Sequence, residues 1–447
     1  KGSRPNVFAI GIIAAQIGLP LESVSKAIHQ TLNKKGKELV ENTLNAIKVG
    51  YSLLGDKSSL LKNWQSSLQP RWNISGNEAC GLGALRGGIK LVAAYPITPA
   101  SDIVEYLALR IEKVGGSVLI AEDELAAMNM LIGSSFGGIA SMTATSGPGI
   151  SLMIEAMGLA IASEIPALVI NVMRGGPSTG IPTKSEQTDL NQALFGMHGE
   201  APHVVVAPLS ITDNVSTTEW AVGLAEAIQT LVILLSDQSL GQSRAIIDVV
   251  PAKNYALTRK VLTEKKSTEP YERYAVTKDF ISPMAIPGNK EGIYTADGLE
   301  HTSTGTPSSM ASDHADQLKK RQSKVTQFDY GDEWADIFTN DKMSQGIVLT
   351  WGSTYGSVKE AVIELNQEGI SIDLLALRLL MPLHVEAIKK LCKNKKVIVV
   401  EQSYSGQFYH YCLGQGAIDT SSLSLAEPGP LKLKKSDIKH FIKEVLA

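Results

Sequence analysis

Two short charged segments stand directly behind apolar runs, at positions where a strand ends. Glu122-Asp123-Glu124 follows Ser117–Ala121, and Arg174 follows Ala167–Met173. A buried carboxylate can share a proton with a ring nitrogen of a heterocycle, and a guanidinium can bind a carboxylate through parallel hydrogen bonds. Simpler explanations exist, because acidic residues stabilise helix N-termini and an arginine at a strand end commonly forms a surface salt bridge. The residues alone leave both explanations open.

The segment Tyr95-Pro96-Ile97-Thr98-Pro99-Ala100-Ser101 joins an apolar run to a helical pattern. Proline fixes φ and restricts the residue before it, so the two prolines predict a rigid turn. Thr98 is predicted as the helix N-cap and Pro99 as the first helical residue. Open α/β sheets bind ligands at the carboxyl ends of their strands. The segment is therefore either a ligand-binding turn or only a helix start.

Other loops also carry polar residues that could contact a ligand. Ser146-Gly147-Pro148-Gly149 is a strand-to-helix turn that lets a ligand approach the backbone, although a tight turn without a ligand explains it equally well. His198 reads more simply as a structural hydrogen-bonding group. Gly81–Arg86 resembles half of a dinucleotide fingerprint, but it lies inside a helical pattern, which favours close helix packing.

Several common catalytic motifs are absent. The chain has no GxSxG, HExxH or P-loop pattern. It also lacks the Gly-Asp-Gly followed by Asn with which thiamine enzymes hold Mg²⁺ and diphosphate. Its cysteines, Cys80, Cys392 and Cys412, are scattered without CxxC spacing, so we expect neither a metal site nor an iron–sulfur cluster from this chain alone.

Composition limits the function classes further. The 447 residues are 44% hydrophobic and 19% charged, with a net charge of −3, which argues against a nucleic-acid binder. No apolar run reaches the ~18 residues of a membrane span, and no signal peptide is visible. We expect a cytoplasmic protein without membrane association. The chain begins at Lys1 without a methionine, and we expect upstream residues to be missing.

The residues above need a scaffold, and the apolar periodicity predicts one. Residues 1–62 have helical patterns, which predict the end of a preceding domain. Residues 72–250 alternate short apolar runs with helical patterns, which predicts a mostly parallel sheet with helices on both faces. The predicted strands are Lys90–Ala94, Ser117–Ala121, Ser141–Thr145, Ala167–Met173, His203–Ala207 and Leu231–Ser236.

The second half of the chain changes character twice. Residues 251–340 are rich in Pro, Gly, Ser and Thr and predict an extended linker with one helix at Ala311–Val325. Residues 341–447 predict a second α/β domain, with strands at Ile347–Thr350, Ile372–Leu375 and Val397–Val400.

In combination, these motifs resemble the α subunit of a 2-oxoacid:ferredoxin oxidoreductase. The resemblance rests on a series of segments spread over nearly the whole chain. They are Gly76–Ala79, Tyr95–Pro99, Glu122–Glu124, Thr145–Gly149, Pro166–Arg174, Thr183–Leu190, Phe195–Glu200, Leu234–Gln238, Ile281–Gly288 and Glu300-His301. The family implies an α/β fold with a pyrimidine-type thiamine-diphosphate-binding domain and a transketolase C-terminal-like domain. Residues 1–51 are similar to the end of the family's γ domain, fused ahead of α.

The resemblance also implies a cofactor and a division of labour. Thiamine diphosphate would lie between this chain and a β subunit, which supplies Mg²⁺, diphosphate contacts and a [4Fe-4S] cluster in an α2β2 assembly. Coenzyme A would be the co-substrate and ferredoxin the electron carrier. Tyr95, Pro96, Ile97, Thr98 and Ser146 would line the cofactor, and Glu124 would hydrogen-bond N1′ of its aminopyrimidine. Without the β subunit the chain would be inactive.

The substrate residues follow from the same resemblance. Thr98 would lie beside the substrate, Arg174 would bind the 2-oxoacid carboxylate, and Thr183, Lys184 or His198 would contact a distal carboxylate. The Ser-Gly-Pro-Gly and Thr-Lys-Ser-Glu-Gln segments resemble 2-oxoglutarate-type subunits. Pyruvate or a branched-chain 2-oxoacid remains an alternative, as does a non-redox thiamine enzyme of the transketolase or decarboxylase kind. A non-catalytic assembly protein is disfavoured by the presence of both Glu124 and Arg174.

Overall fold

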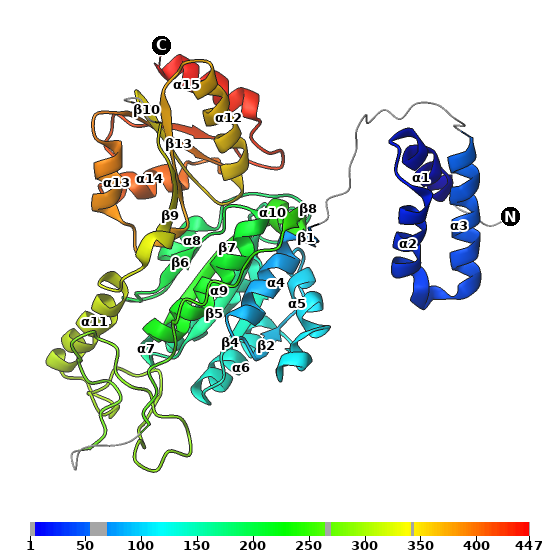
Figure 1. Ribbon diagram of the computed structural model, residues 1–447. Coiled ribbons are helices and arrows are strands. Elements are labelled where there is room, and N and C mark those ends of the chain that lie inside the picture. Colours follow the sequence, from blue (N-terminus) through cyan, green and yellow to red (C-terminus); the bar gives the residue numbers. More distant parts are fainter. Residues whose placement is uncertain (1–4, 54–68, 264–269, 341–343, 447) are drawn as a thin grey trace. The chain divides into compact units, whose positions relative to one another are not determined.

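The computed structural model describes residues 5–53, 69–263, 270–340 and 344–446. The chain divides into two compact units, Lys1–Pro70 and Arg71–Ala447. Each is described by itself (Figure 1).

The first unit is helical, as its periodicity predicts. It contains α1 (Pro5–Gln16), α2 (Leu21–Leu32), a 3-10 turn (Asn33–Lys35) and α3 (Lys37–Ser52). Helices α1 and α3 pack closely because glycines meet at their contact. A Cβ on Gly11 would lie 2.1 Å from the carbonyl oxygen of Ile47, and a Cβ on Gly50 would lie 2.2 Å from that of Phe8. Residues 54–62 of the predicted helical segment lie outside the described residues.

The described strands of the second unit form a seven-stranded sheet, a five-stranded sheet and a two-stranded ribbon. The large sheet has the order β12-β6-β7-β5-β4-β2-β3 and is parallel except for β12, which runs antiparallel to β6. Its strands are β2 (Leu91–Ala94), β3 (Ser117–Ile120), β4 (Ser141–Thr145), β5 (Ala167–Met173), β6 (Val204–Val206), β7 (Leu231–Asp237) and β12 (Leu379–Met381). The strands predicted between residues 90 and 236 are confirmed.

Helices cover both faces of this sheet, because side chains alternate along the buried strands. On β5, Leu168, Ile170 and Val172 face one apolar core, and Val169 and Met173 face the other. The first core includes α4 (Gly76–Arg86), α5 (Ser101–Ala108) and α9 (Ile211–Ile228). The second includes α6 (Glu124–Phe136), α7 (Gly147–Ala162) and α8 (Leu190–Phe195).

The glycines of α4 serve helix packing, as the sequence predicts. A Cβ on Gly83 would lie 2.3 Å from the carbonyl oxygen of Val215 in α9, and one on Gly81 would lie 2.7 Å from the Tyr106 ring. The glycine-rich segment therefore lets α9 approach and is not a nucleotide-binding turn.

Some elements were not predicted. The ribbon pairs β1 (Arg71–Ser75) with β8 (Arg244–Asp248), two short strands far apart in the chain. A 3-10 turn (Ile111–Val114) and α10 (Gln238–Gln242) complete this part of the fold.

The region predicted as a linker contains α11 (Ala311–Thr326), a 3-10 turn (Gly331–Trp334) and β9 (Ala335–Phe338). Helix α11 is fixed by a buried charge cluster at the end of α7. Lys320 Nζ lies 2.6 Å from Glu164 Oε1, and Lys324 Nζ lies 2.8 Å from Glu164 Oε2. Arg273 donates to the carbonyl oxygen of Glu164 over 2.8 Å. Helix α11 and Arg273 are therefore held against the end of α7.

The smaller sheet has the order β14-β13-β10-β11-β9, with only β9 antiparallel to its neighbour. Its later strands are β10 (Gly346–Trp351), β11 (Ile372–Leu377), β13 (Lys396–Glu401) and β14 (Leu423–Ala426). The accompanying elements are a 3-10 turn (Gly352–Thr354), α12 (Tyr355–Gln367), α13 (Val385–Cys392), α14 (Gln407–Gly414) and α15 (Lys435–Leu446). We call residues 335–446 the C-terminal domain.

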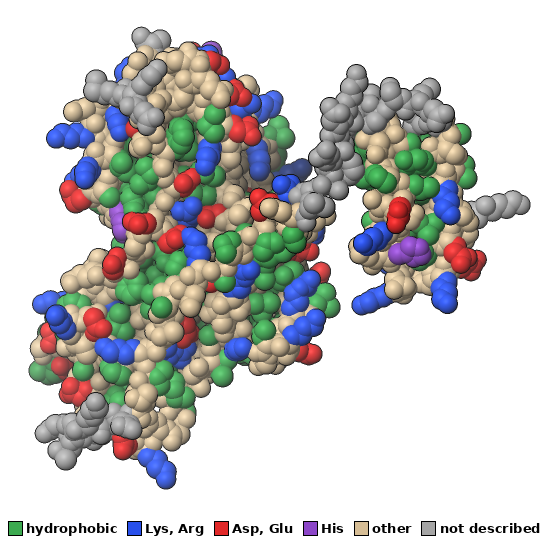
Figure 2. All heavy atoms as spheres, in the orientation of Figure 1, with side chains coloured by type: hydrophobic (Ala, Val, Ile, Leu, Met, Phe, Trp, Pro, Cys, Tyr) green, Lys and Arg blue, Asp and Glu red, His purple; other side chains and the backbone are tan. Residues whose placement is uncertain are grey.

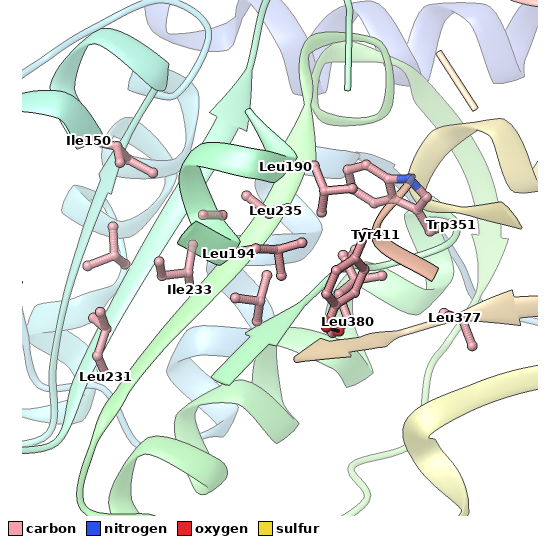
Figure 3. Packing of buried hydrophobic residues seen from close by; sticks show 14 of the residues in the cluster. Ile150, Leu190, Leu194, Leu231, Ile233, Leu235, Trp351, Leu377, Leu380 and Tyr411 are labelled. Carbon is pink, nitrogen blue, oxygen red and sulfur yellow. Dashed lines mark hydrogen bonds between the residues drawn. The ribbon is translucent and has the colours of Figure 1, made fainter. Parts of the chain in front are cut away.

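The two sheets share one continuous apolar core. Leu194 and Ile233 from the first half of the unit pack in the same cluster as Trp351, Leu380 and Tyr411 from the C-terminal domain (Figure 3). Strand β12 also leaves the C-terminal domain and joins the large sheet beside β6. Burying a Leu or Ile side chain contributes roughly 1.5–3 kcal/mol, so this shared core fixes the two sheets together.

The surface agrees with the near-neutral composition. On the face of residues 71–446 that Figure 2 shows, basic and acidic side chains interleave without a continuous basic patch. No helix in the described part of the chain is long and apolar enough to cross a membrane.

Candidate functional site

The large sheet has a topological switch point between β2 and β4. These strands are neighbours, but the helix that follows β2 packs on one face of the sheet and the helix that follows β4 packs on the other. The chain segments that follow β2 and β4 therefore diverge at the carboxyl ends of these strands. Open α/β sheets bind ligands at such a position, which we call the crevice. Tyr95–Ala100 and Ser146 lie at this crevice.

The Tyr95–Ala100 turn differs from its prediction. Helix α5 begins at Ser101, and its N-cap residue is Ala100. Thr98 is not the N-cap and Pro99 is not helical, because the amides of Ala100 and Ser101 instead bond to the carbonyl oxygen of Ile97, at 2.8 and 3.0 Å. The Thr98–Pro99 peptide bond is cis.

Two side chains from other elements hold this turn. Arg174 Nη1 donates to the carbonyl oxygen of Thr98 over 2.6 Å, and Asn77 Nδ2 donates to that of Pro99 over 2.9 Å. The Thr98 side chain is exposed, and Tyr95 keeps 41% of its surface. Arg174 and Asn77 thus fix the backbone of the turn, while the side chains of Tyr95 and Thr98 are exposed.

Glu124 is the first residue of α6 and is only 6% exposed. The helix start is capped by Asp123, whose carboxylate accepts from the amide of Ala126 over 2.7 Å. Glu124 is therefore not needed as a cap. Its carboxylate packs against Gly149, where a Cβ would lie 2.9 Å from Oε1, and it has no hydrogen-bond or ion-pair partner among the described residues. Packing thus holds the side chain in place, while its carboxylate remains available to pair with a ligand.

Ser146 lies on the other side of the crevice, directly before α7. It is fully buried at the N-cap of α7, yet its hydroxyl makes no cap bond and has no partner within the described residues. Helix α7 begins at Gly147. The hydroxyl is therefore free for a ligand.

Arg174 lies at the end of β5 with 7% of its surface exposed. Its Nε is buried without a partner, and the guanidinium forms no ion pair within the described residues. Burial lowers the pKa of Arg174, and the charge of Asp189 acts in the opposite direction. The arrangement leaves a buried cation with unused donors, which suits an anionic ligand.

Asp189 was not predicted as a site residue, although it lies in a segment that carried the resemblance. It accepts from Asn171 Nδ2 over 3.0 Å, and its Oδ2 would lie 2.6 Å from a Cβ on Gly147. Burial raises the pKa of Asp189, while the bond from Asn171 and the charge of Arg174 lower it. No spacing in the sequence points to Asp189, since its contact with the start of α7 arises only on folding.

The other predicted residues are not gathered at the crevice. Thr183 and Lys184 are exposed on the loop after Arg174, although the carbonyl oxygen of Lys184 accepts from the amide of Gly175 over 3.0 Å. His198 is exposed and lies against Gly158. Gly158 is about 16 Å along α7 from Gly147, given the helical rise per residue. Within this chain, His198 is thus distant from Ser146.

Two family models match the sequence of this chain. Residues 82–320, more than half of the chain, match the family model for pyruvate flavodoxin/ferredoxin oxidoreductase, thiamine diphosphate-binding. Residues 345–420 match the model for pyruvate:ferredoxin oxidoreductase core domain II.

Individual relatives of this chain carry names that are consistent with the two family models. The chain is 33% identical to the 2-oxoglutarate synthase subunit KorA of Methanocaldococcus jannaschii over 337 residues, 75% of this chain and 89% of the relative. It is 33% identical to the 2-oxoacid:ferredoxin oxidoreductase 1 subunit alpha of Sulfurisphaera tokodaii over 425 residues, 90% of this chain. The chain spans only 65% of the length of that second relative.

A solved structure is similar over nearly the entire chain. It is the 2-oxoglutarate:ferredoxin oxidoreductase from Magnetococcus marinus with 2-oxoglutarate, coenzyme A and succinyl-CoA bound. It is 34% identical, with a TM-score of 0.89, and the match covers 99% of this chain and 77% of that one. This chain belongs to the family of 2-oxoacid:ferredoxin oxidoreductase α subunits, with a thiamine-diphosphate-binding domain.

Proposed function

We propose that this chain is the α subunit of an enzyme that converts 2-oxoglutarate and coenzyme A to succinyl-CoA and CO₂ and passes the electrons to ferredoxin, or runs the reverse reductive carboxylation. The observation that carries the proposal is the set of side chains at the switch point. Ser146 Oγ and Arg174 Nε are buried without a partner, and the largely buried Glu124 makes no hydrogen bond or ion pair within the described residues. The choice of 2-oxoglutarate is supported by the names of the M. jannaschii relative and the M. marinus structure.

The residues at the crevice fit the pyrimidine side of thiamine diphosphate. A ring nitrogen would meet the unpartnered carboxylate of Glu124, and the unpartnered hydroxyl of Ser146 would offer a donor or acceptor to polar groups of the ring. When bound, the cofactor supplies the nucleophilic carbon and the electron sink that loss of CO₂ from a 2-oxoacid requires. Glu124 would hold a proton at its carboxylate oxygen against the ring nitrogen.

Arg174 would orient the 2-oxoacid by binding its carboxylate through its unused donors, while its bond to the Thr98 carbonyl fixes the guanidinium. The proposal places Mg²⁺, the diphosphate contacts and the [4Fe-4S] cluster on a β subunit. Within the described residues, no group of three or more His, Cys, Asp or Glu side chains could hold a metal ion.

The test is to purify the chain with its partner and to measure viologen or ferredoxin reduction with coenzyme A over a panel of 2-oxoacids. We expect the highest kcat/KM with 2-oxoglutarate. A preference for pyruvate or a branched-chain 2-oxoacid would overturn the substrate assignment but keep the reaction. Thiamine-dependent turnover without electron transfer would overturn the reaction itself.

Arg174→Ala is expected to raise the KM for the 2-oxoacid about 10- to 100-fold, because a hydrogen bond to a charged group contributes roughly 1.5–3 kcal/mol. Steady-state kinetics at saturating coenzyme A would measure this change. Arg71→Ala is the control, since Arg71 is exposed and pairs with Asp248 on the β1–β8 ribbon. An unchanged KM in Arg174→Ala would remove the arginine from the substrate site.

A further inference from the structure

The segment that follows Arg174 leaves the large sheet and docks on the C-terminal domain. Gln187 is fully buried there. The backbone amide of Gln187 donates to the carbonyl oxygen of Gln402 over 2.9 Å. In return, the backbone amide of Gln402 donates to Gln187 Oε1 over 2.7 Å. Gln187 Nε2 donates to the carbonyl oxygen of Trp351 over 2.9 Å. All of these bonds join Gln187 to backbone groups of Trp351 in β10 and of Gln402, the residue after β13.

The backbone of the C-terminal domain is shaped to receive this side chain. Gly352 has a φ of +60°, and a Cβ there would lie 2.7 Å from Gln187 Nε2. A glycine at this position therefore both permits the left-handed conformation and leaves room for the amide.

Gln407 makes a second set of contacts a few residues further on. Its Nε2 donates to the carbonyl oxygen of Thr188 over 2.9 Å, and its Oε1 accepts from the amide of Asn191 over 2.9 Å. Gln407 is held in place because it is the first residue of α14. The start of this helix is fixed by the buried carboxylate of Glu401, whose Oε2 accepts from the backbone amide of Phe408 over 3.0 Å. We call Gln187, Gln402 and Gln407 the amide lock.

Asp189 lies between the two points of attachment. With Thr188 and Asn191 fixed, its carboxylate is carried to Asn171 and to the start of α7, where its charge acts on Arg174. The lock is thus connected to the site through one acidic residue.

We propose that the C-terminal domain is a positioning element of the 2-oxoacid site, because the amide lock fixes the segment from Gln187 to Asn191 and so holds Asp189 against Asn171 on β5, the strand that Arg174 follows. The inference rests on the function proposed above. The C-terminal domain would then have two roles. Its apolar residues pack in the core that joins the two sheets, and its amide lock positions the segment that carries Asp189.

The experiment compares Gln187→Ala and Gln407→Ala in the complex of the full chain with its partner. Gln367→Ala is the matched control, because Gln367 is exposed at the end of α12 in the same domain. Each variant is examined by steady-state kinetics and by amide hydrogen exchange of peptides that cover residues 175–191 and, separately, β5.

We expect both lock variants to raise the KM for the 2-oxoacid at least about tenfold with a smaller change in kcat, and to speed exchange of residues 175–191 but not of β5. Gln187→Glu is expected to be at least as impaired as Gln187→Ala, because a buried carboxylate oxygen would face the carbonyl oxygen of Trp351. The control should match the wild type in both measurements.

Faster exchange of residues 175–191 with an unchanged KM would reduce the lock to domain packing and overturn the proposal. Unchanged exchange in both lock variants would also overturn it, since the segment would then be fixed by other contacts. If the wild-type complex turns over no 2-oxoacid, the proposed function fails and this inference fails with it, whereas exchange still reports whether the lock holds the segment.

Discussion

Glu124→Gln is expected to lower 2-oxoacid-dependent electron transfer by at least about 100-fold while the chain still assembles with its partner. Glutamine has nearly the same shape, so it can occupy the buried space beside Gly149 without disturbing α6. It cannot act as a proton acceptor, and the group that faces the ring nitrogen would lose its charge. Viologen reduction with 2-oxoglutarate and coenzyme A would measure the loss, and gel filtration would measure assembly.

Glu122→Gln provides the matched control, because Glu122 lies two residues away and is exposed. We expect this variant to retain nearly full activity. Retention of most activity by Glu124→Gln would show that the carboxylate does not serve the cofactor, and the candidate site would lose its central residue.

Glu164→Gln is expected to destabilise the second unit by about 3–5 kcal/mol at pH 7. Glu164 is 1% exposed and is the carboxylate that both Lys320 and Lys324 contact, so its loss leaves buried cations without a counter-charge. Urea unfolding followed by tryptophan fluorescence would measure the difference. Glu155→Gln on the exposed side of α7 is the control and should be near neutral.

The same pair of proteins should differ in their response to acid. Although burial raises it, the charges of Lys320 and Lys324 lower the pKa of Glu164 well below its usual range. Its contribution is therefore complete above the ordinary Glu pKa of about 4.3 and is lost as the pH falls, by up to about 1.4 kcal/mol per pH unit. The stability gap between wild type and Glu164→Gln should shrink between pH 5 and pH 3; a constant gap would contradict this assignment.

Local patterns predicted most of the large sheet. Alternating apolar runs and helical periods report how much of each segment is buried, and burial is decided by a few consecutive residues. The strands β2 to β7 therefore follow from the sequence, whereas the short helix α8 between β5 and β6 was not predicted. The prediction of Thr98 as an N-cap was wrong because capping rules consider side chains, whereas here the carbonyl oxygen of Ile97 satisfies the first amides of α5.

Pairings between distant segments were not predictable in this way. Strand β9 lies in the predicted linker yet joins the smaller sheet, and β12 lies in the C-terminal domain yet joins the larger one. Both are short, and their pairing depends on partners that no local window contains. Lys320 and Lys324 show a helical spacing of four residues. That spacing does not indicate that both lysines form buried ion pairs with Glu164, which lies more than 150 residues earlier in the chain.

The sequence by itself determined the family resemblance, the strands β2 to β7 of the large sheet, and the residue types able to bind a ring nitrogen and a carboxylate. Only the tertiary structure decided that Arg174 and Asn77 hold the Thr98–Pro99 turn, that Asp189 contacts Asn171 on β5, and that His198 lies against Gly158, far along α7 from Ser146. The physical reason is that a site at a switch point is made where chain segments part on opposite faces of a sheet. That geometry is set by the order in which strands pair, which local sequence does not encode.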